Sequence, residues 1–100
     1  MKKVYICGPV TGMKNHNKEA FFKAEEKILN RGDYPVNPHT ICMGIPNHAS
    51  WRTFMRRCIR HLTECDEAIL LEGWQNSKGA RLEYGIMHNL GIEMIQEHEL

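Results

Sequence analysis

The chain has 100 residues, which suits one small domain over residues 1–100 with a single modest core, and domains of this size often gain stability from oligomerisation. Hydrophobic residues make up 42% and charged residues 25%, as in ordinary soluble globular proteins, and the net charge of +1 argues neither for nor against nucleic acid. No apolar run approaches the roughly 18 residues of a membrane-spanning helix, and Met1-Lys2-Lys3 leads into a strand-like segment rather than a signal peptide. We therefore expect a cytoplasmic homo-oligomer, a dimer or larger, without a membrane or nucleic-acid partner.

The first part of the chain has the pattern of a strand, a helix and a second strand. Lys3–Cys7 is a short, mostly apolar run, which predicts a strand buried on both faces, and the loop Gly8–Gly12 follows it. Asn17 is a suitable N-cap for a helix over Lys18–Asn30. Tyr34–Pro38 predicts a second strand, and its prolines favour an edge position in a sheet.

A long loop and a third amphipathic segment come next. The loop covers His39–Ala49, and loops of this length in small domains are often functional. Ser50 is a suitable cap for a helix over Trp51–Glu64. Its predicted inward residues are Trp51, Phe54, Met55, Cys58, Leu62 and Cys65. We interpret the arginines of its outer face as solvated rather than RNA-binding: Arg52, Arg56, Arg57 and Arg60.

The last part of the chain completes an alternating pattern. Asp66–Leu71 predicts a third strand, a helix capped by Ser77 follows, and Gly91–Ile95 begins a fourth strand. This order implies an α/β fold: a small doubly wound parallel sheet in the flavodoxin-like order 2-1-3-4, with helices on both faces. Ligands of such sheets bind where the strand order reverses. Here that crevice would lie between Gly8–Gly12 and Glu72–Glu83.

Glu83 stands out because the helix pattern places its carboxylate where a core residue is normal. With Ser77 as the N-cap, we expect Glu83 in the first turn, on the inward side of the helix. The same side carries Ile86, Met87 and Leu90. The unpaired N–H groups and positive partial charge of a helix N-terminus would keep this carboxylate ionised. The alternative is a helix-start glutamate paired with Arg81 or Lys78.

The cysteines favour reduced, buried thiols over disulfides or a metal site. Three of the four lie in apolar segments, and the set is Cys7, Cys42, Cys58 and Cys65. Cys58, His61 and Cys65 share one side of a predicted helix, and His39-x-x-Cys42 precedes them. These spacings match no standard zinc framework, so we expect no metal.

The loop Gly8-Pro9-Val10-Thr11-Gly12 has the composition of a tight turn between a strand and a helix. Its glycines permit close backbone approach, and their N–H groups are suited to cradling a phosphate or a sugar. The loop lacks the Gly-x-Gly-x-x-Gly spacing and the Walker lysine, so neither a dinucleotide-binding nor an ATPase function is predicted.

Together, these segments resemble the DUF4406 family of small phage and bacterial proteins, over nearly the whole chain. The resemblance rests on Val4–Gly12, Asn37-Pro38, Cys65-Asp66 and Gly73-Trp74-x-x-Ser77-x-Gly79-Ala80-Arg81-x-Glu83. The DUF4406 family is in turn similar to the nucleoside 2-deoxyribosyltransferase superfamily, which includes the 2′-deoxynucleoside 5′-monophosphate N-hydrolases.

The resemblance implies a retaining N-glycosidic chemistry without a cofactor. Glu83 matches the glutamate that attacks C1′ of a deoxyribose, and Tyr5 matches the tyrosine that orients it. Water or a second base would then take up the glycosyl-enzyme intermediate. The partner implied is a small-molecule nucleoside or nucleotide.

The chain also departs from these enzymes at defined positions. Cys58 stands where they carry an aspartate that handles the proton of the leaving base. Asp66 is a candidate substitute, although its position at the start of a strand suits a loop or cap residue better. Pro9 and Thr11 stand where the monophosphate hydrolases use a serine and an arginine. A different anion site would draw on Thr11, the Gly12 N–H, Ser77, Lys78 and Arg81.

The sequence leaves two main candidate functions and a third that is less favoured. The first is an N-glycosidic bond hydrolase or transferase with Glu83 and Tyr5 as catalytic residues. Its substrate-binding candidates are Gly8, Thr11, Gly12, His39, Trp74, Ser77, Lys78, Gly79 and Arg81. The second is a non-catalytic protein of the same fold that binds a nucleotide or another small molecule, which Cys58 favours. The third, a structural or host-interaction protein, draws on the arginine-rich helix face.

Overall fold

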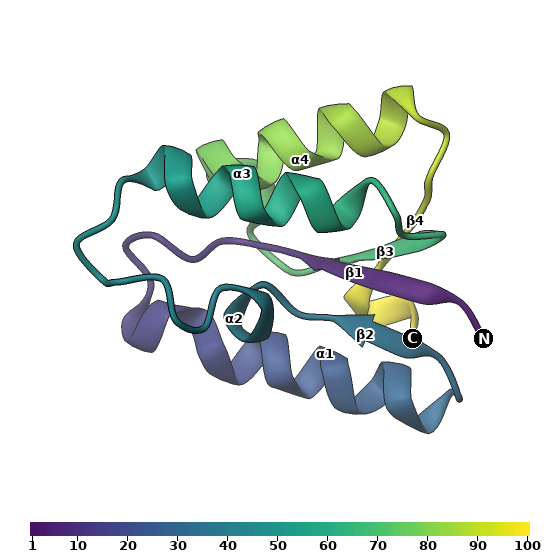
Figure 1. The fold of residues 1–100 in the computed structure, drawn as a ribbon. Coiled ribbons are helices and arrows are strands. Elements are labelled where there is room, and N and C mark those ends of the chain that lie inside the picture. The colour runs from purple at the N-terminus through teal and green to yellow at the C-terminus, as the bar shows by residue number, and fades with distance from the viewer.

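The computed structural model describes residues 1–100 as a four-stranded parallel sheet between helices (Figure 1). The strands are β1 (Lys3–Cys7), β2 (Tyr34–Val36), β3 (Glu67–Leu70) and β4 (Glu93–Gln96), in the order β2-β1-β3-β4. One face is covered by α1 (Lys18–Asn30), and the other by α3 (Trp51–Leu62) and α4 (Lys78–Asn89) (Figure 1). The predicted doubly wound, flavodoxin-like α/β fold is confirmed.

The central strand β1 divides the core into two layers. It pairs in parallel with both β2 and β3, so that Tyr5 lies opposite Val36 on one side and Ala68 on the other. Tyr5 and Cys7 face the layer under α3 and α4, while Val4 and Ile6 face α1. Side chains alternate across a strand, so a strand between two helical layers must be apolar on both faces. β1 therefore delivers the side chain of Tyr5 directly beneath α3 and α4.

The entry to α1 differs from the prediction. Asn17 does not cap the helix with its side chain, which instead donates a hydrogen bond to the Pro9 carbonyl (3.0 Å). Asn15, His16 and Asn17 all have positive φ angles (51°, 54° and 61°) within a short 3₁₀ turn, Lys14–Asn17. Left-handed conformations cost free energy in residues other than glycine. The turn that leads from β1 into α1 is thus a strained segment, tied to the loop after β1.

The segment after β2 is also more helical than the sequence pattern suggests. β2 ends at Val36, and a short helix α2 (Pro38–Ile41) occupies the start of the predicted loop. The Asn37 side chain caps it by accepting a hydrogen bond from the His39 N–H (3.0 Å), with proline at the first helical position. The Asn37-Pro38 pair therefore begins a helix instead of ending a strand.

Two predicted core residues lie at the surface. Trp51 is 41% exposed and Leu90 is 57% exposed. Each lies at an end of its helix, where the inward-facing positions extend beyond the sheet. The predicted cap of α3 is confirmed, since Ser50 accepts a hydrogen bond from the Thr53 N–H (3.2 Å), but this helix ends at Leu62 rather than at Glu64. None of the helices combines the length and apolar character that a membrane crossing requires.

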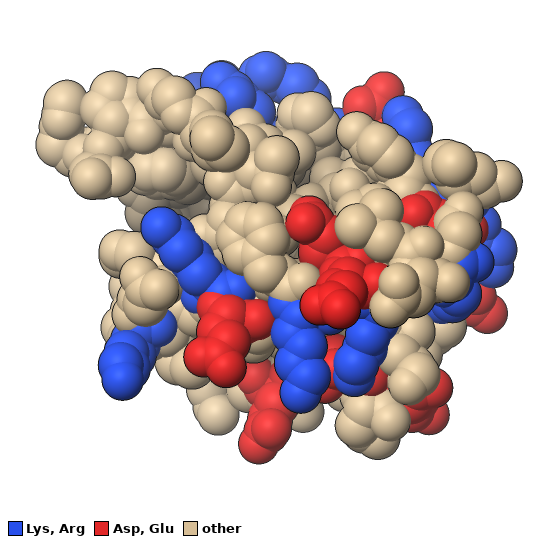
Figure 2. Space-filling model, turned by 90° about the horizontal axis from the view of Figure 1, so that it is seen from below, with Lys and Arg blue, Asp and Glu red and all other residues tan.

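A buried ion network lies at the end of the sheet where the strands begin. Glu67 is 2% exposed and accepts hydrogen bonds from Arg31 (2.5 Å) and from Lys2 (3.3 Å). Burial raises the pKa of Glu67, but the Arg31 hydrogen bond and charge outweigh it and hold this pKa below its usual range. Acidic and basic side chains also alternate across the α1 side of the molecule (Figure 2). Carboxylates at this end are thus neutralised by cations.

Gly8, which follows β1, packs against Leu71, which follows β3. A Cβ atom at Gly8 would lie 2.7 Å from Leu71 Cβ, closer than side chains tolerate. This residue is therefore required for close packing of the two chain segments.

We predict that Gly8→Ala destabilises the fold by about 1–3 kcal/mol, because the added methyl group overpacks the contact with Leu71. Gly85→Ala is the matched control. It lies in α4 with open space around a Cβ, so it should leave stability unchanged or raise it by up to about 1 kcal/mol. Urea unfolding of the three proteins measures both effects. Equal stability of Gly8→Ala and the native chain would contradict the packing role.

Candidate functional site

Glu83 lies on the sheet-facing side of α4, in the second turn rather than the predicted first. Ser77 caps the helix by accepting a hydrogen bond from the Ala80 N–H (3.2 Å), which fixes the register. Ala80, Glu83 and Met87 then face inward together, and Glu83 is only 5% exposed. The spacing in the sequence therefore identified the inward position of this carboxylate correctly.

Tyr5 and Glu83 are joined by a short hydrogen bond. The Tyr5 hydroxyl donates to Glu83 Oε2 over 2.6 Å, and the Tyr5 side chain is fully buried. These residues are 78 positions apart in the sequence and meet because β1 passes beneath α4. A hydrogen bond to a carboxylate in a low-dielectric site is among the stronger polar contacts in a protein. The pair therefore fixes the position of the carboxyl group.

The surroundings of Glu83 change its acidity. Burial raises the pKa of Glu83 from 4.5 to about 7, and the hydrogen bond from Tyr5 and the nearby Cys7 thiol limit this rise. The helix N-terminus was expected to keep the group ionised, but Glu83 lies beyond the first turn and is desolvated, so its pKa is raised instead. Near neutral pH the carboxyl group is balanced between its two protonation states.

No cation neutralises Glu83. The alternative pairing with Arg81 or Lys78 is wrong, because both side chains are engaged elsewhere. Arg81 is exposed and donates to the Gln75 carbonyl (3.1 Å), and the Lys78 ammonium lies 4.3 Å from the centre of the Trp51 ring. The polar groups next to the carboxyl group, the Tyr5 hydroxyl and the Cys7 thiol, are therefore neutral donors.

Those neutral donors keep their protons. Burial and the neighbouring Glu83 charge raise the pKa of Tyr5 well above 10.0, and the same causes raise the pKa of the Cys7 thiol. Cys7 Sγ also donates to the Ala80 carbonyl (3.5 Å), at the start of α4. Cys7 is a member of this site that the sequence analysis missed, although its alternation with Tyr5 along β1 points to the same face.

The two loops expected to line the crevice pack directly against each other. Gly8 contacts Leu71, and a Cβ at Gly73 would lie 3.6 Å from the Pro9 ring. Trp74 follows at this corner and stacks on Tyr84 of α4, with ring centres 4.4 Å apart. Its indole Nε1 is buried without a hydrogen-bond partner. One ring face of Trp74 thus packs on Tyr84, and its indole N–H lies beside α4 without an acceptor.

The remaining predicted binding residues are spread around this end of the sheet. Gly79 packs on α3, since a Cβ there would lie 3.1 Å from Met55 Sδ. Thr11 and Gly12 are exposed in the loop after β1. His39 is half-buried at the start of α2, packed edge-on against Phe21 of α1 (4.8 Å), with its Nε2 buried and unpartnered. Burial lowers the pKa of His39.

The position of Cys58 lies next to the Tyr5–Glu83 pair. Its thiol is 3.7 Å from that of Cys42, and it is close enough to the Tyr5 hydroxyl to raise the Tyr5 pKa. The Cys42 contact and burial raise the pKa of Cys58 far above its ordinary value. Asp66 is no substitute acid, because it lies at the opposite end of the sheet, just before β3, and accepts a hydrogen bond from the Lys3 N–H (3.0 Å). No group of three or more His, Cys, Asp and Glu side chains is arranged to hold a metal ion.

Two surface hollows lie away from Glu83. The larger, of about 490 Å³, runs along the outer side of α4 between Arg81 and Leu90. The other, of about 260 Å³, lies beside β2 and is lined in part by Asn37 and His61.

The fold and this arrangement define a flavodoxin-like α/β protein with a buried carboxyl–tyrosine pair under its fourth helix. The chain belongs to the DUF4406 family, a domain of unknown function, whose family model matches residues 2–96.

A solved structure has the same fold. The chain is similar to 2-deoxyribosyltransferase from the psychrotolerant bacterium Bacillus psychrosaccharolyticus, with a TM-score of 0.73 and 17% sequence identity. The match covers 94% of this chain and 70% of that one. No curated protein matches the chain in sequence.

The raised pKa of Glu83 predicts how stability depends on pH. The folded state holds its proton up to about pH 7, while the unfolded chain releases it near pH 4.5, so the folded protein loses stability as pH rises between these values. Glu83→Gln cannot ionise and should avoid this loss. Relative to the native chain, we expect it to gain about 2–3 kcal/mol in unfolding free energy from pH 5 to pH 8.

Urea unfolding at the two pH values measures this difference. Glu26→Gln is the matched control, because Glu26 is exposed on α1, and its pH profile should run parallel to that of the native chain. A parallel profile for Glu83→Gln as well would mean that Glu83 titrates as an ordinary exposed glutamate.

Proposed function

We propose that the protein cleaves or transfers N-glycosidic bonds of deoxynucleosides or deoxynucleotides, with Glu83 as the nucleophile. The observation that carries this proposal is the hydrogen bond of 2.6 Å between the Tyr5 hydroxyl and a Glu83 carboxyl group that has no cationic partner. The resemblance to deoxyribosyltransferases adds the substrate class. The related fold comes from a protein described as a 2-deoxyribosyltransferase used to make nucleosides.

The chemistry divides into two displacements at one carbon. The Glu83 carboxylate attacks C1′ of the deoxyribose, the bond to the base breaks, and a glycosyl ester forms on Glu83. Water then cleaves the ester and releases deoxyribose, or a second base attacks C1′ and forms a new nucleoside. Each displacement inverts the configuration at C1′, so the two together retain it, and each route regenerates the Glu83 carboxylate.

Tyr5 has two roles in this proposal. Its hydroxyl binds one carboxylate oxygen and leaves the other free to attack, and its bond compensates for part of the cost of burying the charge. Because Tyr5 stays protonated, it acts as a fixed donor rather than as a base. It is a positioning residue for the nucleophile.

The substrate would approach from the end of the sheet where β1 and β3 finish. There the unpartnered Trp74 indole N–H and the exposed Thr11 and Gly12 offer contacts to a base or a sugar. Lys78 and Arg81 are both exposed at the start of α4, so either cation would reach a 5′-phosphate by giving up its contact with the Trp51 ring or the Gln75 carbonyl. Gly8, Ser77 and Gly79 would act indirectly, by shaping the loop and the helix start.

A second candidate is a binding protein of the same fold without turnover, and the environment of Cys58 favours it. A thiol whose pKa is raised so far is a poor donor of a proton to a leaving base. In this case Tyr5 and Glu83 would hold a sugar hydroxyl instead of attacking a carbon. An assay that detects both release and binding separates the two candidates.

We expect release of free base from at least one member of a panel of deoxynucleosides and their 5′-monophosphates, followed by chromatography. Glu83→Ala should lower the rate by about 10³-fold or more through loss of the nucleophile. Tyr5→Phe should lower it by about 10²-fold through loss of one preorganised donor. Tyr34→Phe and Glu26→Ala, both at exposed positions, are the matched controls and should retain the native rate.

The outcomes discriminate between the two candidates. Base release that survives Glu83→Ala would contradict the proposed nucleophile. Thermal stabilisation of the native chain by a nucleotide, with no base released from any compound, would favour the binding protein.

A further inference from the structure

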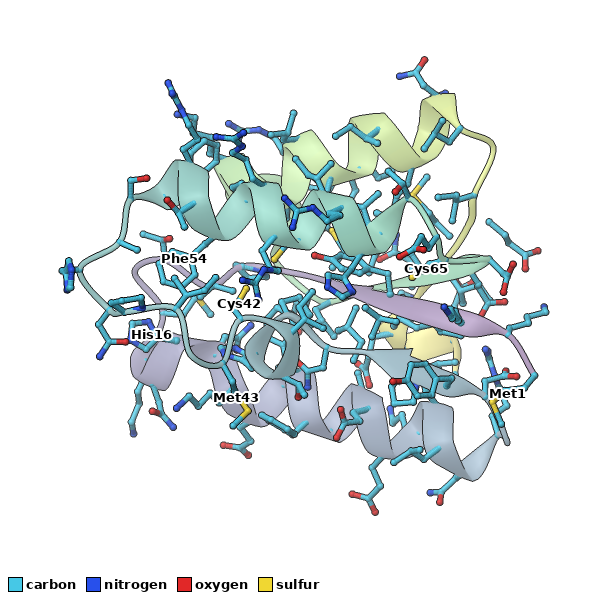
Figure 3. All side chains as sticks on the ribbon, viewed as in Figure 1. Met1, His16, Cys42, Met43, Phe54 and Cys65 are labelled. Atoms are coloured by element: carbon cyan, nitrogen blue, oxygen red, sulfur yellow. The ribbon has the colours of Figure 1, made fainter.

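Two of the four cysteines form a close pair between α2 and α3. The Sγ atoms of Cys42 and Cys58 are 3.7 Å apart, and both cysteines are free thiols. Cys42 follows the last residue of α2, and its side chain lies between α2 and α3 (Figure 3). A disulfide has a sulfur–sulfur distance of about 2.0 Å, so the two sulfurs would have to approach further, by rotation of these side chains, to form the bond.

The two thiols have unequal environments. Cys42 is partly exposed, whereas Cys58 is buried. The hydrogen bond with Cys58 lowers the pKa of Cys42, burial opposes this, and the Arg57 charge lowers it further. Arg57 is held nearby, because its guanidinium donates to the Ile41 carbonyl (3.0 Å). Glu83, the other charged group that faces Cys42, raises its pKa, but the net shift is downward. Cys42 is thus the more reactive and more accessible member of the pair.

The other two cysteines lack these features. Cys7 donates to the Ala80 carbonyl and Cys65 to the His61 carbonyl, each over 3.5 Å, and neither contacts a second thiol. Burial raises the pKa of both, that of Cys65 to about 11. Cys65 also lies near the far end of α3 from Cys42 (Figure 3). These two thiols are inert by comparison.

We propose that Cys42 and Cys58 form a redox-modifiable dithiol, in which Cys42 reacts first with a peroxide and Cys58 then closes a disulfide. The Cys42 thiol gives up its proton, and the thiolate attacks one peroxide oxygen, so that the O–O bond breaks and sulfenic acid and hydroxide form. The hydroxide takes up the released proton and becomes water. The Cys58 thiol attacks the Cys42 sulfur and releases a second water. Two thiols and one hydrogen peroxide thus become one disulfide and two waters.

The modification would sit beside the Tyr5–Glu83 pair without using it. Cys58 neighbours the Tyr5 hydroxyl, so a disulfide to Cys42 would alter the packing beneath that hydroxyl. It would also tie the end of α2 to the middle of α3 and close the intervening segment into a loop. This inference does not depend on glycosidic activity.

Peptide mapping of the full-length native protein tests the proposal. After brief treatment with hydrogen peroxide near neutral pH, we expect a peptide pair joined through Cys42 and Cys58, which a dithiol reductant separates again. Cys42→Ser and Cys58→Ala should each abolish the joined pair, and Cys65→Ser, the matched control, should retain it. Absence of this pair in the native chain, or joining through Cys7 or Cys65, would overturn the proposal.

Alkylation of the reduced protein tests the assigned order independently. With iodoacetamide under native conditions, Cys42 should react at least about 10-fold faster than the other three cysteines. Preferential labelling of Cys58, Cys7 or Cys65 would overturn the role of Cys42 as the first thiol to react.

Discussion

The structure depends on the burial of one carboxyl group against one phenol. Glu83 occupies a position in α4 that would suit an apolar side chain, and an unsatisfied carboxyl group there would cost several kcal/mol. Tyr5 satisfies it from the middle of β1, so the helix and the central strand are coupled through their polar atoms as well as their apolar ones. Gly79 lies one turn before Glu83 in α4 and packs against Met55 of α3, which supports this arrangement.

The buried carboxyl groups at the two ends of the sheet have opposite environments. Glu67 is neutralised by Arg31 and Lys2 at the end where the strands begin, and its pKa is lowered. Glu83 receives only neutral donors at the other end, and its pKa is raised. Ion pairing fixes a charge in place, whereas neutral donors leave a carboxyl group able to change its protonation state. This contrast is the physical reason for locating function at Glu83 rather than at Glu67.

The order of strands and helices and the inward position of Glu83 were predictable, because both follow from short-range periodicity and loop signals. The start of α2 was not, since Asn37-Pro38 suits the end of an edge strand as well as an N-cap followed by proline. The acidity of Glu83 was also mispredicted. Desolvation depends on how much chain covers the group, which no local pattern reports. The Cys42–Cys58 contact likewise arises only when α2 folds onto α3.

The central claim is that Tyr5 stabilises a buried Glu83 carboxyl group that titrates near neutrality. Carbon-13 NMR of the glutamate side-chain carboxyl signals as a function of pH tests it most directly, with Glu83 assigned by comparison with Glu83→Gln. The account predicts a midpoint at about 7 in the native chain and a higher midpoint in Tyr5→Phe, since the lost hydrogen bond favours the ionised form. A midpoint near 4.5 in the native chain, or one that Tyr5→Phe leaves unchanged, would contradict it.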